Sequence, residues 1–177
     1  MVTALLTLEL ASCADASEAD TDYDVVTDVP VMGWTEADTL CFAVQVAESV
    51  RHTPVPLRGI DYRLRCSVRI QPDYAFAEVP MLLIVQQTDT AGLGQGTRVV
   101  RNLMRRNISV RVRDAAGHPL GPTWGSMAQH EEMIDSLTLR FDTTGSYRLL
   151  LLPRAYNHTS LPGITAIGIS LNRSKTP

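Results

Sequence analysis

Two short stretches carry residues that bind metal or phosphate in other settings. His130 begins the run HEEMI, which starts like the zinc-binding helix motif with two histidines one helical turn apart. Ile134 occupies the position of the second histidine, so no metal-binding pair is predicted. Residues 92–96, GLGQG, lack the Lys-Ser/Thr pair of a nucleotide loop, and Thr97 stands where the dinucleotide fingerprint has its last glycine. We interpret them as a flexible connection between two strands.

The other nucleophiles and bases form no recognisable active site. The four histidines fall in predicted loops: His52, His118, His130 and His158. No serine or cysteine has the setting of a nucleophile elbow. Cys41 and Cys66 are too few for a usual zinc site, and they form either a disulfide or two separate buried thiols. We therefore expect no enzyme, no metal and no cofactor.

A cluster of arginines is the one feature that could bind an anion, such as a polysaccharide or a lipopolysaccharide headgroup. Its members are Arg98, Arg101, Arg105, Arg106, Arg111 and Arg113. Aromatic residues are not interleaved with them, so nucleic acid is not a predicted partner. The alternative is a solvated strand face that meets acidic side chains elsewhere. Trp34 and Trp124 could stack on a sugar, although a lone tryptophan at a strand end more often covers a core edge.

The stretch LASC, residues 10–13, has the composition of a bacterial lipid-attachment site. Residues 2–8 are mostly apolar, Ala11 and Ser12 precede Cys13, and the chain then turns acidic, as in an export signal that is cut before a lipidated cysteine. Glu9 and the lack of Lys or Arg before the apolar run depart from the usual signal. We expect residues 1–12 to be removed and Cys13 to carry acyl chains. The alternative is an N-terminal strand with a buried cysteine.

Residues 13–24 differ in composition from the rest of the chain. Acidic residues alternate there with small ones, and nothing could fill a core. We expect a solvated tether between the lipid and one domain over residues 25–177, a length that suffices for a hydrophobic core. The net charge of −3 gives no indication of nucleic acid as a partner.

A hydrophobic period of two dominates the chain and predicts β-strands. Strands are expected at residues 40–46, 63–70, 80–87, 108–113, 137–141, 147–152 and 164–171. A short helix or irregular excursion, capped by Ser126, is expected over residues 125–134. So many short strands are typical of a sandwich or a barrel, and we expect an all-β, single antiparallel β-sandwich, jelly-roll-like, of about seven to nine strands.

Strand alternation also predicts which side chains face the core. The inward set is Leu40, Phe42, Val44, Leu64, Val68, Leu139, Phe141 and Leu149. The outward set is Arg63, Arg65, Arg111 and Arg113.

Four blocks of sequence match the pattern of a known family. The first is the order Tyr23, Pro30, Trp34, Asp38 and Phe42, and the second is YRLRCSVRIQPDYAFAEVPMLLIV from Tyr62. The third is RVRDAAGHPLGPTWG, and the fourth is FDTTGSYRLLLLPRAYNHTSLPGITAIGISL from Phe141. Together they resemble the GldH family of gliding-motility lipoproteins from Bacteroidota. Candidate family positions are Trp34, Asp38, Arg69, Tyr74, Arg154 and Gly163.

The resemblance implies an outer-membrane lipoprotein with a structural or assembly role in the gliding and type IX secretion machinery, without catalysis. Its partners would be the membrane, through the N-terminal lipid, and other envelope proteins; either face of the outer membrane is open to it. The competing interpretation is a surface glycan-binding sandwich. An exposed aromatic shelf with Trp34, Trp124 or Tyr156 would favour glycan, whereas burial of Trp34 and Trp124 would favour assembly. A hydrolase, the third class, would need a cleft with converging histidines and carboxylates.

Overall fold

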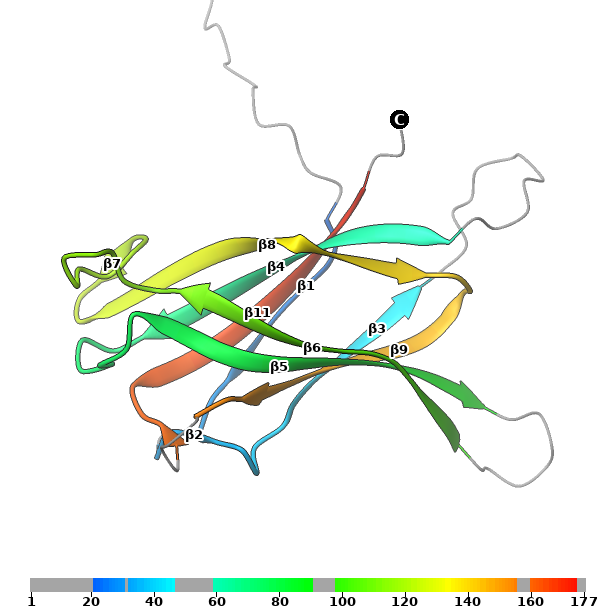
Figure 1. Ribbon diagram of the computed structural model, residues 1–177, viewed down its shortest axis with the longest axis horizontal. Helices are drawn as coiled ribbons and strands as arrows, with labels where there is room; N and C mark the ends of the chain where they lie inside the picture. Colours follow the sequence, from blue (N-terminus) through cyan, green and yellow to red (C-terminus); the bar gives the residue numbers. More distant parts are fainter. Residues whose placement is uncertain (1–20, 31, 47–58, 91–97, 156–159, 175–177) are drawn as a thin grey trace, which may run out of the picture.

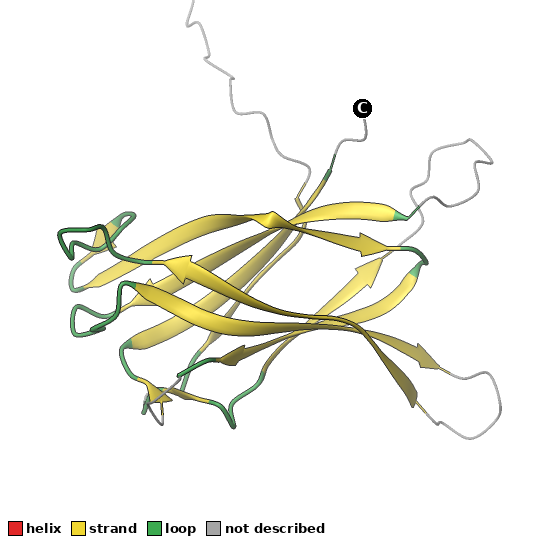
Figure 2. Ribbon diagram, in the orientation of Figure 1, coloured by secondary structure: helices red, strands yellow, loops and turns green. Residues whose placement is uncertain are grey.

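The computed structural model describes residues 21–30, 32–46, 59–90, 98–155 and 160–174, in which all regular secondary structure is β (Figure 2). Eight longer strands occur in these ranges: β1 (Thr21–Asp28), β3 (Leu40–Val46), β4 (Ile60–Ile70), β5 (Glu78–Thr90), β6 (Arg98–Arg111), β8 (Met127–Phe141), β9 (Gly145–Pro153) and β11 (Ile164–Arg173). Two-residue strands are β2 (Trp34–Thr35), β7 (Thr123–Trp124) and β10 (Ser160–Leu161). This part of the chain holds no helix able to cross a membrane.

The longer strands pair in a nested order (Figure 1). β1 pairs with β11, β3 with β9, β4 with β8, and β5 with β6. The first sheet has the order β1-β11-β4-β8-β7 and the second sheet the order β3-β9-β5-β6. Nested antiparallel pairs divided between two packed sheets are the arrangement of a jelly roll. The predicted antiparallel β-sandwich is therefore confirmed.

The core lies between the two sheets, where alternate side chains of each strand meet. All eight residues predicted to face inward are buried. Phe141 of the first sheet and Tyr147 of the second have ring centroids 4.5 Å apart, so aromatic contacts join the layers. Arg63 and Arg111 are exposed, whereas Arg65 and Arg113 are half-buried. A period of two was thus sufficient to assign the faces of these strands.

β1 is the longer strand that the sequence pattern misses. Thr21, Tyr23 and Asp24 already pair with β11, so the domain boundary predicted at residue 25 is too late. Asp24 was predicted to belong to a solvated tether, but it is exposed on an edge strand, as is Asp28. Charged side chains are common on such strands because they discourage pairing with strands that do not carry the opposite charge.

The helix or irregular excursion predicted over residues 125–134 is also wrong. Gly125, with φ of +59°, and Ser126 connect β7 to β8, and the following residues pair with β4. His130 and Glu132 oppose Val68 and Cys66, whose side chains face the core. Polar residues are tolerated on this inward face because β8 lies beside the open edge of the sandwich.

β6 and β8 border this open side (Figure 1). β6 is the last strand of the second sheet, and only the two-residue β7 lies beyond β8 in the first sheet. Glu132 links the two edges, because its Oε2 accepts a 2.7 Å hydrogen bond from the backbone N–H of Arg111.

Candidate functional site

Trp34 and Asp38 stabilise the connection between β2 and β3. The Trp34 side chain is fully buried, and its Nε1 donates a 2.7 Å hydrogen bond to the carbonyl oxygen of Asp38. Oδ2 of Asp38 accepts hydrogen bonds from the backbone N–H and the hydroxyl of Thr35, at 3.1 and 2.6 Å. Trp34 therefore offers no surface on which a sugar could stack.

Tyr74 and Gly163 pack the loop after β4 against the turn before β11. Tyr74 is buried, and its hydroxyl donates a 2.8 Å hydrogen bond to the carbonyl oxygen of Glu78. Burial, and secondarily the charge of Glu78, raises the pKa of Tyr74. Gly163 has φ of +83°, and a Cβ there would lie 3.1 Å from the Tyr74 backbone. Glycine thus permits both the left-handed conformation and the close contact.

Arg69 and Arg154 make local contacts as well. Arg69 donates from Nε and Nη2 to Oε1 of Gln129, its cross-strand neighbour on β8, at 3.3 and 3.1 Å. Arg154 Nη1 lies 3.9 Å from Oε1 of Glu36. All six candidate family positions thus have structural contacts, and these contacts do not assemble a catalytic centre.

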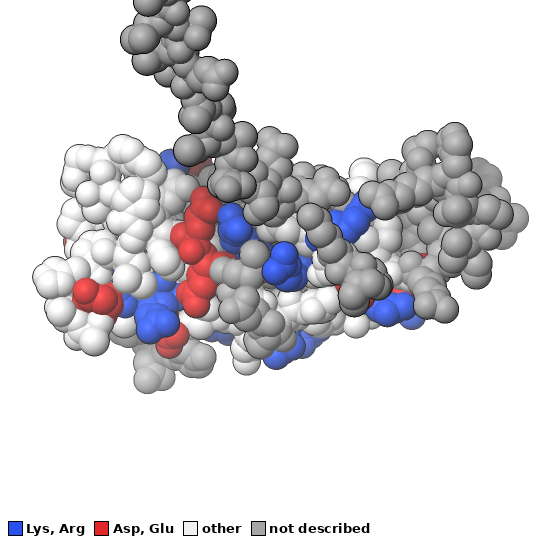
Figure 3. Space-filling view, turned by 90° about the horizontal axis from the view of Figure 1, so that it is seen from above, with Lys and Arg blue, Asp and Glu red and all other residues white. Residues whose placement is uncertain are grey.

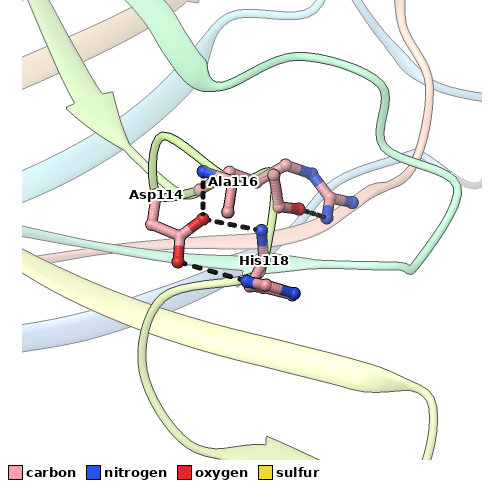
Figure 4. A network of polar contacts seen from close by, with 5 residues as sticks. Asp114, Ala116 and His118 are labelled. Carbon is pink, nitrogen blue, oxygen red and sulfur yellow. Dashed lines mark hydrogen bonds and ion pairs between the residues drawn. The ribbon is translucent and has the colours of Figure 1, made fainter.

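Asp114 organises the connection between β6 and β7 (Figure 4). Its Oδ1 accepts hydrogen bonds from the backbone N–H groups of Ala116 and His118, at 2.9 and 2.8 Å. Its Oδ2 lies 3.3 Å from Nδ1 of His118. These contacts, led by the backbone N–H of His118, lower the pKa of Asp114. The loop therefore keeps a defined shape although it is exposed.

A groove of about 570 Å³ opens between this loop and β8. It is lined by Arg111, Asp114, Ala115, Leu120, His130, Glu131 and Glu132. Charges of both signs and apolar side chains are thus available to a ligand. Cys66, the cross-strand neighbour of Glu132, is buried. Burial, with a smaller effect of the Glu132 charge, raises the pKa of Cys66 to about 12. A thiol with so high a pKa is not an activated nucleophile.

The chain that lines the groove continues into the β7–β8 hairpin, which exposes two large apolar side chains. Trp124 is 58% exposed, and its cross-strand partner Met127 is 37% exposed. Seen from above, a band of acidic side chains crosses the molecule with basic ones beside it, whereas the end that carries β7 shows few charges (Figure 3). Tryptophan and methionine are enriched in protein interfaces. The Gly-Ser pair between them could have indicated a hairpin, but the exposure of Trp124 has no sequence signal.

The predicted arginine cluster divides into two roles. Arg113 donates to the carbonyl oxygens of Pro72, Tyr74 and Gly117 at 2.8 to 3.0 Å, so it is structural. The others with described side chains are exposed: Arg101, Arg105, Arg106 and Arg111. None of these four guanidinium groups forms an ion pair with another described residue. The expected pairing with acidic side chains is therefore not found for them.

Cys41 and Cys66 are both free thiols. Cys41 is exposed on β3 of the second sheet, and Cys66 is buried in the core face of the first. The possible disulfide is therefore not formed, and of the alternative, two buried thiols, only Cys66 is buried. Other predicted positions lie outside the described residues: Cys13, His52, residues 92–96, Tyr156 and His158. The described residues contain no group of three or more His, Cys, Asp or Glu placed to hold a metal.

Comparison with protein families decides the assignment. A family model described as GldH lipoprotein matches residues 21–171, from the first residue of β1 into β11. The chain belongs to the GldH lipoprotein family. It is thus a gliding-motility-associated lipoprotein of the cell envelope, from a family not known for enzymatic activity.

Other comparisons are less informative than the GldH assignment. A search among curated proteins gave no match. A chain from a crystal structure of tomato aspermy virus aligns with 93% of this chain and 82% of its own length, at 10% sequence identity and a TM-score of 0.30. So weak a likeness bears on neither fold nor function.

Proposed function

We propose that this GldH lipoprotein is held at the envelope by lipid on Cys13 and docks other proteins of the gliding and type IX secretion machinery, without turning over a substrate. The supporting observation is the exposed pair of Trp124 and Met127 on the hairpin beside the charged groove. Protein interfaces typically combine an apolar centre with a polar rim, and the hairpin and the groove could supply these two parts.

Trp124 should dominate the energy of such an interface. Truncation of a central tryptophan typically costs at least about 2 kcal/mol, because it removes a large area of apolar contact. The groove supplies the polar rim through Arg111, Glu131 and Glu132. The family positions do not compete for this role, since Trp34, Tyr74 and Gly163 pack within the protein.

We expect Trp124→Ala to release the main partner while the domain stays folded. Envelopes would be solubilised in detergent, and proteins retained by affinity-tagged wild type and variant would be quantified by mass spectrometry. A loss of at least about tenfold in one or more partners is expected, from the energy of an interface tryptophan. Met32→Ala is the matched control, because Met32 is 90% exposed but lies outside the groove and hairpin. Equal partner recovery in wild type and Trp124→Ala would refute docking through the hairpin.

The same comparison addresses the glycan alternative. The burial of Trp34 favours an assembly role, whereas the exposure of Trp124 would also allow glycan binding. Specific binding of wild type to a glycan array, lost in Trp124→Ala and accompanied by unchanged protein partners, would replace the docking proposal with a glycan-binding one.

A separate expectation concerns the anchor. Cys13→Ser removes the acceptor of the acyl chains, and two or three chains hold a protein on a membrane where one does not. The variant should therefore move from the membrane pellet to the soluble fraction, or remain unprocessed. It should also restore function poorly in a deletion strain. A processed Cys13→Ser chain that still pelleted after a high-salt wash would contradict lipid anchoring.

A further inference from the structure

β6 is a long sheet edge with one side open to another strand. In the second sheet it pairs with β5 from Arg98 to Arg111 and has no other strand neighbour among the described residues. The hydrogen bond from the backbone N–H of Arg111 to Glu132 occupies this edge only at its last residue. Along an edge strand, alternate residues direct their N–H and C=O groups away from the sheet, where they can pair with a further strand.

The side chains along this edge carry uncompensated positive charge. Arg101, Arg105 and Arg106 are exposed and have no ion pair within the described part of the chain. Other strands differ: on β4 and β8, Arg65 lies 3.6 Å from Glu131, and Arg140 lies 2.9 Å from Asp142. The arginines of β6 are therefore accessible to carboxylates of another molecule.

The register places these charges on both sides of the edge. Arg105 pairs with Ile84, and Arg106 pairs with Leu83, which faces the core, so the two arginines project to opposite faces of the sheet. The register shift between Val85 and Gln86 leaves Leu103 without a pairing partner and interrupts the ladder. A strand added beside β6 would meet guanidinium groups on both of its own faces.

We propose that the β6 edge accepts an extended acidic segment of a partner protein by strand addition. This inference rests on the proposed docking function and specifies the chemistry of the partner. Strand addition supplies main-chain hydrogen bonds, while carboxylates at alternate positions pair with the arginines. A polysaccharide or a lipid headgroup would match the charge but not the row of backbone donors and acceptors.

The same edge leads toward the exposed hairpin. Arg111, the last residue of β6, lines the groove, and the wall of the groove continues through Leu120 into β7. A partner whose acidic strand follows β6 can thus reach Trp124 with an apolar side chain. Two linked contacts of this kind bind more tightly than either contact alone.

The test uses the full chain with Cys13→Ser and a fluorescent peptide of about ten residues, alternating valine and glutamate, a length that matches a typical strand. Binding is measured by fluorescence anisotropy. We expect this peptide to bind and a valine–lysine peptide not to bind. Two further versions of the valine–glutamate peptide carry N-methyl groups on alternate residues, one version on the valines and the other on the glutamates. Each version keeps the charges but blocks main-chain hydrogen bonds along one edge of the peptide. At least one of the two should bind about tenfold more weakly or worse, the size expected for several lost hydrogen bonds.

Protein variants locate the site. The double reversal Arg105→Glu with Arg106→Glu should weaken binding about tenfold, because each exposed charge pair is modest and reversal adds repulsion. The matched control, Arg63→Glu with Arg140→Glu, reverses two exposed arginines of the first sheet and should bind like wild type. Melting curves establish that both double variants are folded.

Several outcomes would overturn the inference. Equal affinity for the valine–glutamate peptide and both of its N-methylated forms would show that binding depends on charge alone and not on main-chain hydrogen bonds. Lipopolysaccharide binding lost in the β6 double variant, without any peptide binding, would make the arginines an anion site. If Trp124→Ala releases the native partner but the β6 double variant retains it, docking stands and strand addition fails; if neither variant releases it, the docking function itself fails.

Discussion

Replacing Phe42 with alanine should lower the free energy of unfolding by about 3 to 5 kcal/mol. Phe42 is 1% exposed in β3 and contributes to the core shared by the two sheets. Its removal loses buried apolar surface and leaves a cavity that the strand pairing of β3 with β9 prevents from collapsing. Urea denaturation followed by circular dichroism measures the change.

Arg65→Ala is the matched comparison in the opposite sheet. The Arg65 side chain is 41% exposed and lies 3.6 Å from Glu131, itself half exposed. Water screens such a pair, so its loss should cost less than about 1 kcal/mol. Similar losses for Phe42→Ala and Arg65→Ala would mean that the assignment of strand faces is incorrect.

Gly121→Ala should be the most damaging change near the groove, with a loss of about 2 to 4 kcal/mol. Gly121 has φ of +78°, and a Cβ there would overlap the backbone carbonyl oxygen of Gln129 on β8. The backbone of Gln129 cannot rotate away as a flexible side chain can. The loop that contains Gly121 must therefore move away from β8. Because this loop and β8 form the two walls of the groove, the variant should also lose partner proteins in the affinity experiment.

Gly117→Ala separates this overlap from backbone strain. Gly117 has φ of +86°, but nothing lies within 4 Å of a Cβ placed there. It shares the left-handed conformation and should cost only about 1 kcal/mol. Thermal unfolding of the two variants gives the comparison, and an equal loss in both would leave strain, rather than contact with Gln129, as the cause.

Most of the strands could be predicted because their burial follows a local pattern. Leu40 to Val46 and Leu64 to Ile70 alternate strictly, and the structure places the apolar set inside. β1 could not be predicted in this way, since its acidic residues are explained only by its position at a sheet edge. The polar start of β8 is explained by the open side of the sandwich, which is likewise a tertiary property.

The candidate site was less predictable than the fold. Trp34 and Trp124 are the same residue type near short strands, yet one is buried and the other is exposed. What differs is the structure around them: Trp34 donates to Asp38 inside a turn, whereas Trp124 lies beside Met127 on a two-residue hairpin. The groove joins Arg111 with Glu132, residues brought together by two sheets, and no local spacing indicates that contact.

The pairing of β1 with β11 also determines when the protein can fold. β11 lies between β1 and β4, so the first sheet is incomplete until the residues of β11 are available. Contacts between such distant segments slow folding, because the intervening chain must be closed into a loop before they form. During synthesis, the N-terminal strand therefore lacks its partner until almost the whole chain has emerged. The first sheet would thus be completed late, whereas β5 and β6, which are consecutive in the chain, can pair earlier.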